Sequence, residues 1–430
     1  MFIARSAARV RLARLGFLLL CLGPTAGLTA WAVHRRSEAH RVALEQRWQE
    51  ILGVPLAVRA VDHPRPGVIR LEGVALPAAG GGVTLRLPLV ELESSANEDR
   101  LRVPRLRGDA AAAAVLIGLA RDWLIDDVRF RRTCVIEVAD FAWTETPAAG
   151  LERAAGPRSS AATLRIECVA RPEARALRIV HRSATDDEVR IVRGPRPEAA
   201  DEAGPPAITI TADCRQPVPL DVVAVAAGLP LQWSAACREA LVAGTLTADW
   251  TAAGWSGSAQ GSIGQVSLEA AAAAVGGRAS GIADVTVSKL VWTNDRLSDG
   301  LFECTAGPGS VGGRLFDRFV MALGARPGSA ARPLPPGGER PFDLLACLVA
   351  LGPHGVQILP TSRMPAAIAA YDREPLLLPP PSAAPSDRVA WLLSAPGTTF
   401  GPAAGPGAWL ISVLPNASEA SPKAESPARF

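Results

Sequence analysis

The residues of this sequence that are able to do chemistry are few and widely separated. Gly307, Gly309 and Gly312 match the pattern G-x-G-x-x-G, which in dinucleotide-binding proteins follows a strand, opens a helix and cradles phosphate. Here no acidic residue ends a second strand about 20 positions later. The segment that follows, 324–340, is rich in Pro, Gly and Arg instead of forming a βαβ unit. We therefore interpret these glycines as a turn and expect no cofactor.

The cysteines and histidines do not have the spacing of a metal site. None of the seven cysteines lies in a C-x-x-C pair, and no H-E-x-x-H motif is present, so we expect no bound metal. Cys134, Cys168 and Cys214 fall on the apolar sides of predicted strands, where a buried free thiol packs as a small hydrophobic group. The sequence favours that interpretation. One or two cross-strand disulfides are the alternative if the chain is exported.

No motif for nucleophilic catalysis is found. There is no G-x-S-x-G elbow, and the five histidines are far apart in the sequence. We expect a protein that is not an enzyme, with an exported hydrolase as the alternative, because a Ser-His-Asp triad assembles in space. Trp143, Trp250, Trp255 and Trp292 fall in or near strands. They are interpreted as packing residues, and a platform for an apolar or sugar ligand is the alternative.

The chain as a whole has the composition of a folded protein with many short strands. Of its 430 residues 48% are hydrophobic, which supplies ample material for a core. The 39 Gly and 37 Pro residues are typical of strands joined by turns and of linkers. A net charge of +3 is too small for the basic surplus of a nucleic-acid-binding protein, so we expect no such partner.

The strongest local signal is at the N-terminus. Residues 15–33 carry no charged side chain, and 19 residues at 1.5 Å each extend about 28 Å, close to the ~30 Å hydrocarbon core of a bilayer. We predict a single membrane span, and the arginines before it favour a cytoplasmic N-terminus. A signal peptide cleaved after Ala30-Trp31-Ala32, or a buried helix, is the alternative. The residues that mark the span are Leu15, Leu18, Leu20, Leu22, Leu28, Trp31 and Val33.

Several later segments alternate apolar and polar residues with a period of two. The clearest are 128–138, 162–168 and 208–214, and this pattern predicts an antiparallel sheet that is apolar on one side. Asp109 is a predicted N-cap for a helix over 110–125. This helix and those predicted over 219–229 and 311–323 cover part of that side, and the remainder forms an apolar groove. The residues predicted to line the groove are Val128, Phe130, Ile136, Val138, Leu164, Ile166, Ile208 and Ile210.

The predicted fold class is mainly β with a few helices (α+β). An N-terminal transmembrane helix is followed by an elongated, curled, antiparallel sheet covered by short helices. The predicted organisation is a membrane anchor (1–36), a β-rich exported domain (37–323), a Pro/Gly linker (324–340), a C-terminal hairpin with short helices (341–414) and a disordered tail (415–430).

Residues 10–107 resemble the start of AsmA/TamB-like bacterial envelope proteins. The resemblance rests on an N-terminal anchor, then Leu52-Gly53-Val54-Pro55, then residues 66–76 with the pattern PG…L-x-G-V-x-L. It implies an apolar β-groove on the periplasmic side of the inner membrane, with a function in lipid transport or outer-membrane integrity. The partners expected are the membrane, lipid acyl chains and envelope proteins. The alternative is a non-catalytic scaffold or assembly factor of an envelope or secretion complex.

Overall fold

A computed structural model describes the chain apart from residues 1–10, 12–13, 78–83, 127–131, 145–161, 172–173, 184–185, 196–205, 227–238, 336, 393–412 and 415–430. Its N-terminal part is helical, with η1 (Leu18–Leu22), α2 (Gly23–Arg35) and α3 (Glu38–Leu52) in succession. The Ser37 side chain accepts a hydrogen bond from the His40 backbone N–H at the start of α3. Gly53 ends that helix with a φ of 70°.

Residues Arg14–Arg35 form one helix that is long and apolar enough to cross a membrane, and none of its most apolar window is buried against the rest of the chain. The predicted span residues lie on it and are all exposed, from 48% for Leu22 to 79% for Leu20. This supports a membrane-spanning segment. Its length and composition do not distinguish an anchor from a signal sequence.

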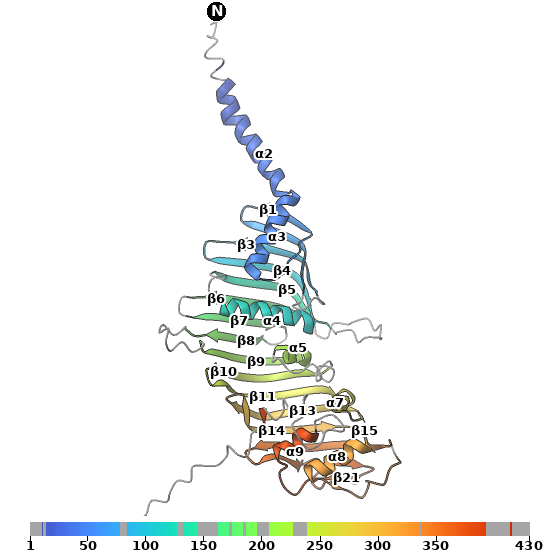
Figure 1. Ribbon diagram of the computed structural model, residues 1–430. Helices are drawn as coiled ribbons and strands as arrows, with labels where there is room; N and C mark the ends of the chain where they lie inside the picture. The colour runs from blue at the N-terminus through green and yellow to red at the C-terminus, as the bar shows by residue number, and fades with distance from the viewer. Residues whose placement is uncertain are drawn as a thin grey trace, which may run out of the picture.

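One long sheet dominates the remainder of the chain. Among the described residues, eighteen strands form this sheet and three short strands form another. The long sheet follows the chain strand by strand from β1 to β11 and then continues through β13 and β14 to β18. Figure 1 shows these strands as a stack that extends away from the N-terminal helix.

The strands of the upper part of the stack are β1 (Ala60–Arg65), β2 (Val68–Pro77), β3 (Thr84–Ser94), β4 (Glu98–Gly108), β5 (Thr133–Trp143), β6 (Ala162–Ala170), β7 (Arg175–Arg182) and β8 (Asp186–Arg193). Those of the lower part are β9 (Ile208–Pro219), β10 (Leu241–Thr251), β11 (Gly254–Ser267), β13 (Ile282–Thr293), β14 (Arg296–Ala306) and β18 (Leu344–Gly352). The end is completed by β16 (Arg326–Pro327), β19 (Gly355–Pro360), β20 (Ala369–Tyr371) and β21 (Glu374–Leu378).

One pair in this sheet, β4 with β5, is parallel, where the sequence analysis expected antiparallel pairing throughout. A parallel pair needs a crossover connection, and α4 (Ala110–Ile125) supplies it. The Asp109 side chain accepts a hydrogen bond from the Ala112 N–H and begins this helix as predicted. Strand β4 was not predicted, because Pro104 and its many charged residues hide its strand pattern.

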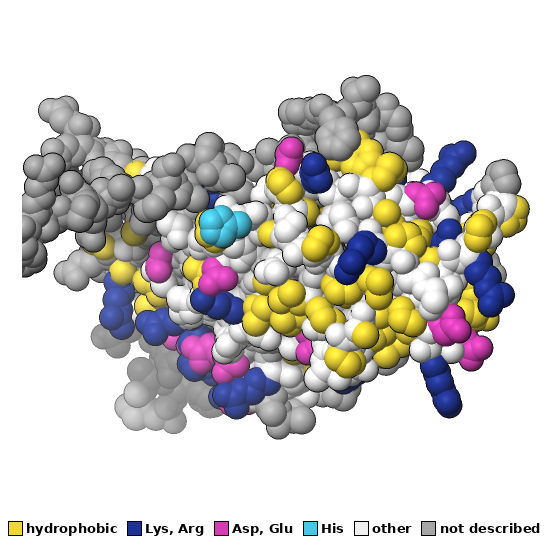
Figure 2. Space-filling model, turned by 90° about the horizontal axis from the view of Figure 1, so that it is seen from below, with side chains coloured by type: hydrophobic (Ala, Val, Ile, Leu, Met, Phe, Trp, Pro, Cys, Tyr) yellow, Lys and Arg dark blue, Asp and Glu magenta, His cyan; other side chains and the backbone are white. Residues whose placement is uncertain are grey.

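Shorter helices lie along the lower half: α5 (Leu220–Ala226), α7 (Leu268–Ala274), α8 (Gly313–Leu323) and α9 (Ser386–Leu392). Seen from below, hydrophobic side chains gather over the middle of this end of the molecule, and most of the charged ones lie toward its edges (Figure 2). Helix α8 begins two residues later than predicted, because Gly309–Gly312 form β15 and pair with β12 (Ala279–Ser280) and β17 (Glu339–Phe342) in the small sheet. Of the predicted helix 219–229, residues 227–229 lie outside the described residues. The mainly β architecture with an N-terminal apolar helix is the predicted one.

Candidate functional site

A continuous apolar face runs along the long sheet, as the strand register shows. Leu246 of β10 lies opposite Ala212 of β9 and Ala259 of β11, and Ala259 lies opposite Leu290 of β13. In the upper half Ile136 is opposite Ile166, which is opposite Ile179. The segments with period two therefore place their apolar residues on one side of the sheet, as their sequence pattern predicted.

Helices bury the upper part of this face. Val115 and Leu116 of α4 pack with Val138 and Leu164 in one core, and Trp123 at the other end of α4 packs on β6 and β7. Of the predicted groove residues, Val138 and Leu164 are thus buried under a helix, while Ile136 and Ile166 are half-buried. Val128 and Phe130 lie outside the described residues.

Over β9, β10, β11, β13 and β14 the described helices cover this face only in part. Its side chains there are half-buried, whereas their neighbours in the same strands, such as Thr247 and Thr286, are exposed on the opposite side. We call this region the open apolar face. It contains the last two predicted groove residues and is made of Ile208, Ile210, Leu246, Trp250, Trp255, Ala259, Ile263, Val285, Val287, Leu290, Trp292 and Phe302.

Three tryptophans gather at one end of the open apolar face. Trp250 and Trp255 lie opposite each other across the β10–β11 hairpin, with ring centroids 6.4 Å apart. Trp292 lies opposite Gly257, and a Cβ at that glycine would come within 2.7 Å of the indole. The glycine thus gives the ring room to lie over the strand. Trp143 is not part of this group and packs edge-on against Phe141 in the covered half.

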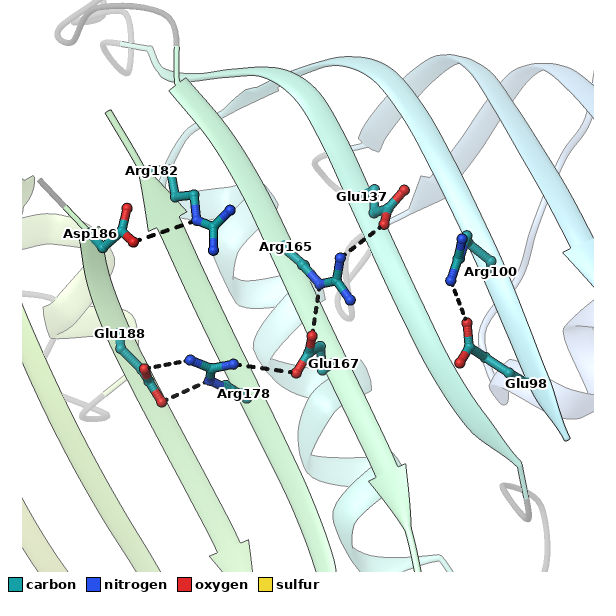
Figure 3. Close-up of polar contacts among 9 residues, drawn as sticks. All are labelled: Glu98, Arg100, Glu137, Arg165, Glu167, Arg178, Arg182, Asp186 and Glu188. Atoms are coloured by element: carbon teal, nitrogen blue, oxygen red, sulfur yellow. Dashed lines mark hydrogen bonds and ion pairs between the residues drawn. The ribbon is translucent and has the colours of Figure 1, made fainter. Parts of the chain in front are cut away.

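The opposite face of the upper sheet is charged. An ion-pair series runs from Glu137 of β5 to Arg165 and Glu167 of β6, then to Arg178 of β7 and Glu188 of β8 (Figure 3). Hydrogen bonds from Arg178 hold the pKa of Glu188 below its usual value. Because these side chains are solvated, each pair adds little to stability, but together they keep this face hydrophilic.

Two arginines of the sheet lie on the covered half of the apolar face, at the C-terminus of α4. The Arg175 guanidinium, only 4% exposed, donates to the Trp123 carbonyl, and Arg193 donates to the Ile125 carbonyl. Two arginines thereby satisfy free carbonyls at the C-terminus of α4, where a positive charge is also favoured by the helix dipole. The sequence analysis missed both, because an arginine in an alternating strand is normally assigned to the solvated side.

A histidine and an aspartate meet on the same side of the sheet. His181 Nδ1 lies 3.6 Å from a carboxylate oxygen of Asp187, which is 4% exposed. The carboxylate accepts hydrogen bonds from the backbone N–H groups of Arg215 and Gln216. Within the described part of the chain, His181 Nε2 has no hydrogen-bond partner, so no serine hydroxyl completes a triad here. The contacts of Asp187 are those of a residue that holds β8 to β9.

The junction between the N-terminal helix and the sheet brings three histidines together. The His40 ring centroid is 5.7 Å from that of His34 and 5.3 Å from that of His63. Burial is the main cause that lowers the pKa values of His40 and His63, and Arg35 lowers both further. The sequence separates these residues by up to 29 positions, so nothing in it predicts the cluster.

A cavity of about 520 Å³ opens beside this junction. Its lining includes Arg35, Arg36, Arg41 and Arg59, which makes it strongly basic. Arg41 is held by Glu38 and Glu45, the latter at 2.6 Å. The cavity lies next to the C-terminal end of the apolar N-terminal helix.

The remaining sequence motifs are placed as follows. The Gly312 and Gly313 N–H groups donate to the Arg278 and Gly338 carbonyls, so the backbone at the start of α8 is already paired. Gly307 lies in the connection between β14 and β15, as a turn residue would, whereas Gly309 and Gly312 belong to strand β15, where the sequence analysis predicted a turn. Among the residues that the structure describes, no group of three or more His, Cys, Asp or Glu side chains is arranged to hold a metal ion.

Comparison with known proteins identifies no relative: no family model, no curated protein and no solved structure matches this chain. The functional interpretation therefore depends on the geometry of the sheet, the N-terminal helix and the junction between them.

Proposed function

We propose that this protein binds the acyl chains of lipids on the open apolar face and handles lipid next to the membrane to which it is attached. The observation that supports this most directly is that the apolar side chains on one side of β9 to β14 remain partly exposed to solvent. A soluble protein normally covers so large an apolar surface, and one that stays partly uncovered indicates a binding site.

The dimensions suit an acyl chain. Five strands about 4.8 Å apart extend about 19 Å across the strands, and the chains of one leaflet occupy about half of a ~30 Å hydrocarbon core. Each methylene removed from water contributes ~0.8 kcal/mol, so about ten of them give a gross gain of ~8 kcal/mol. The entropy lost on binding reduces this figure, and the remainder is enough for reversible binding.

The basic cavity at the helix–sheet junction suits an anionic lipid headgroup at the membrane surface. It lies nine strand spacings, about 43 Å, from Leu246 of β10, so it would receive lipid at the membrane end of the sheet and would not hold the headgroup of a lipid already bound on the open apolar face. Arg36 and Arg59 line it beside the candidate span, and guanidinium groups pair well with phosphate. A location in the inner membrane, with the sheet on the periplasmic side, is part of this proposal. It agrees with the resemblance of residues 10–107 to AsmA/TamB-like proteins, and so does a function in lipid transport or outer-membrane integrity.

Site-specific photocrosslinking in membranes tests the proposal. A photoreactive phenylalanine analogue is introduced into the full chain at Leu246 or Val287 on the open apolar face. The matched controls are Thr247 and Thr286, which are the next or preceding residues of the same strands on the opposite side. We expect phospholipid adducts, identified by mass spectrometry, at the first two positions and none at the controls.

Equal lipid labelling at all four positions, or none at any, contradicts the proposal. Crosslinks from Leu246 and Val287 to one protein partner, without lipid, support the scaffold alternative. To test the headgroup site, the double variant R36Q/R59Q is compared in the same experiment. We expect it to reduce the yield of anionic-lipid adducts at Leu246 several-fold, and to leave the stability of the sheet unchanged.

A further inference from the structure

Four of the seven cysteines lie in two directly opposed pairs. Cys134 of β5 is the register partner of Cys168 of β6, and Cys304 of β14 is the register partner of Cys347 of β18. All four side chains lie on the apolar side of the sheet, and the six described cysteines are free thiols in the structure. Cys214, in contrast, faces Gly244.

We propose that Cys134 with Cys168, and Cys304 with Cys347, are the sites of two cross-strand disulfides. Residues directly opposed in antiparallel strands have Cα atoms about 4.5 or 5.5 Å apart, according to the type of pair, and both values fall within the 4.4–6.8 Å range of disulfides. Closing each bond needs only a small approach of the two Cβ atoms. The proposal is independent of lipid binding.

Each of the two pairs lies next to an interruption in the order of the sheet. Strand β5 enters through the helix crossover and is parallel to β4, so its antiparallel contact with β6 joins it to the strands that follow. Strand β18 joins β14 only after the small sheet and α8 have intervened. A bond at each place restricts the unfolded chain, because Cys134–Cys168 links positions 34 residues apart and Cys304–Cys347 positions 43 residues apart.

Each bond forms by thiol–disulfide exchange with a disulfide oxidant, such as glutathione disulfide or an oxidoreductase. One cysteine, as a thiolate, attacks the S–S bond of the oxidant, forms a mixed disulfide and releases the first thiol. The opposed cysteine then loses its proton and attacks the mixed disulfide, which closes the protein S–S bond and releases the second thiol. The pair loses two electrons and two protons, and the oxidant gains them.

The two pairs differ in how readily they react. A hydrogen bond with Cys347 lowers the pKa of Cys304, so Cys304 is the first nucleophile of its pair. Burial raises the pKa values of Cys134 and Cys168 to about 12, which leaves little thiolate at neutral pH. We therefore expect Cys304–Cys347 to close several-fold faster than Cys134–Cys168 in the folded chain.

The test uses the purified full chain in detergent, reduced, freed of reductant and then incubated with glutathione disulfide at pH 7.5. Remaining thiols are alkylated under denaturing conditions, and the chain is cut with trypsin. Arg165 separates the first pair and Arg314 the second, so each disulfide joins two peptides that mass spectrometry identifies. We expect Cys134–Cys168 and Cys304–Cys347 links, with Cys214 alkylated.

Two variants make the result specific. C134S removes the first link and leaves the second, and C304S does the reverse, so each variant is the control for the other. Alkylation of all four cysteines after prolonged oxidation overturns the proposal. It is also overturned if Cys134 or Cys304 links mainly to Cys214 or Cys237, since only the opposed pairs follow from the register.

Discussion

His40 Nε2 and His63 Nε2 lie 3.1 Å apart, one on the helix that follows the candidate membrane span and the other on the first strand of the sheet. At most one of the two nitrogens can donate in this contact, so it requires at least one neutral imidazole. His34 and Arg35 approach from the preceding helix, and only Asp62 favours the protonated form of His63. The junction is therefore sensitive to acid.

This contact predicts a loss of order at the junction below pH 6.5. Both folded pKa values lie below the ordinary histidine value of about 6.5, so the unfolded chain binds more protons in this range and the folded state loses stability as pH falls. This loss of stability begins near pH 6.5 and is complete at pH values below the folded pKa values of the two histidines. Hydrogen exchange of residues 57–63 at pH 7.5 and 5.5 measures it.

The control for the acid effect is a histidine away from the junction. H40Q and H63Q should each reduce the pH dependence of exchange, whereas H354Q, in the exposed turn between β18 and β19, should retain it. Identical pH dependence in all three variants would show that the histidine contact does not control the junction.

The two sides of β6 predict losses of stability of very different size for substitutions at neighbouring positions. I166D places a carboxylate without a partner against Ile136 and Ile179, and we expect a decrease of about 3 kcal/mol in the free energy of unfolding. E167Q removes ion pairs on the solvated side, and we expect less than about 1 kcal/mol. Urea unfolding of the full chain in detergent compares them. Equal effects would show that the strand faces are assigned incorrectly.

The buried carboxylate between β8 and β9 predicts a similar contrast. D187A leaves the backbone N–H groups of Arg215 and Gln216 without their acceptor, at a cost of about 2 kcal/mol. D186A, at the preceding position, removes only an exposed contact with Arg182 and should cost less than about 0.5 kcal/mol. Thermal unfolding monitored by circular dichroism distinguishes them, and comparable midpoints for the two variants would rule out the structural role of Asp187.

The N-cap of α4 predicts that one substitution at Asp109 lowers stability and that a second one restores it. D109A removes the acceptor for the Ala112 N–H, 2.7 Å away, and should lower the free energy of unfolding by about 1 kcal/mol. D109S keeps an acceptor of similar capping strength and should restore most of the loss. A serine variant as unstable as the alanine variant would argue against capping as the cause.

Much of the sheet was predictable because burial on one side imposes a local pattern. The alternation of 162–168 and 208–214 identified β6 and β9 and their apolar sides, and Asp109 identified the start of α4. Strand β4 was not predicted, because its apolar residues are separated by arginines that a single pattern does not resolve. Its parallel pairing depends on α4, which is a tertiary effect.

The sequence predicted an apolar side of the sheet, but it did not predict which strands of that side stay uncovered. An apolar side was expected, yet the sequence does not tell which strands the helices cover, so Val138 and Leu164 were grouped with Ile208 and Ile210. The histidine cluster and the opposed cysteines depend on contacts between distant segments. Local periodicity carries no information about such contacts.

The order of the strands also sets the length of the long sheet. From β1 to β14 and on to β18 each strand adds about 4.8 Å to the stack, which gives a length of about 60 Å from β1 to β18. Because each strand pairs only with its neighbours, the number of strands sets the length of the sheet. A hairpin gained or lost in evolution changes its length by about 10 Å without altering the contacts at either end.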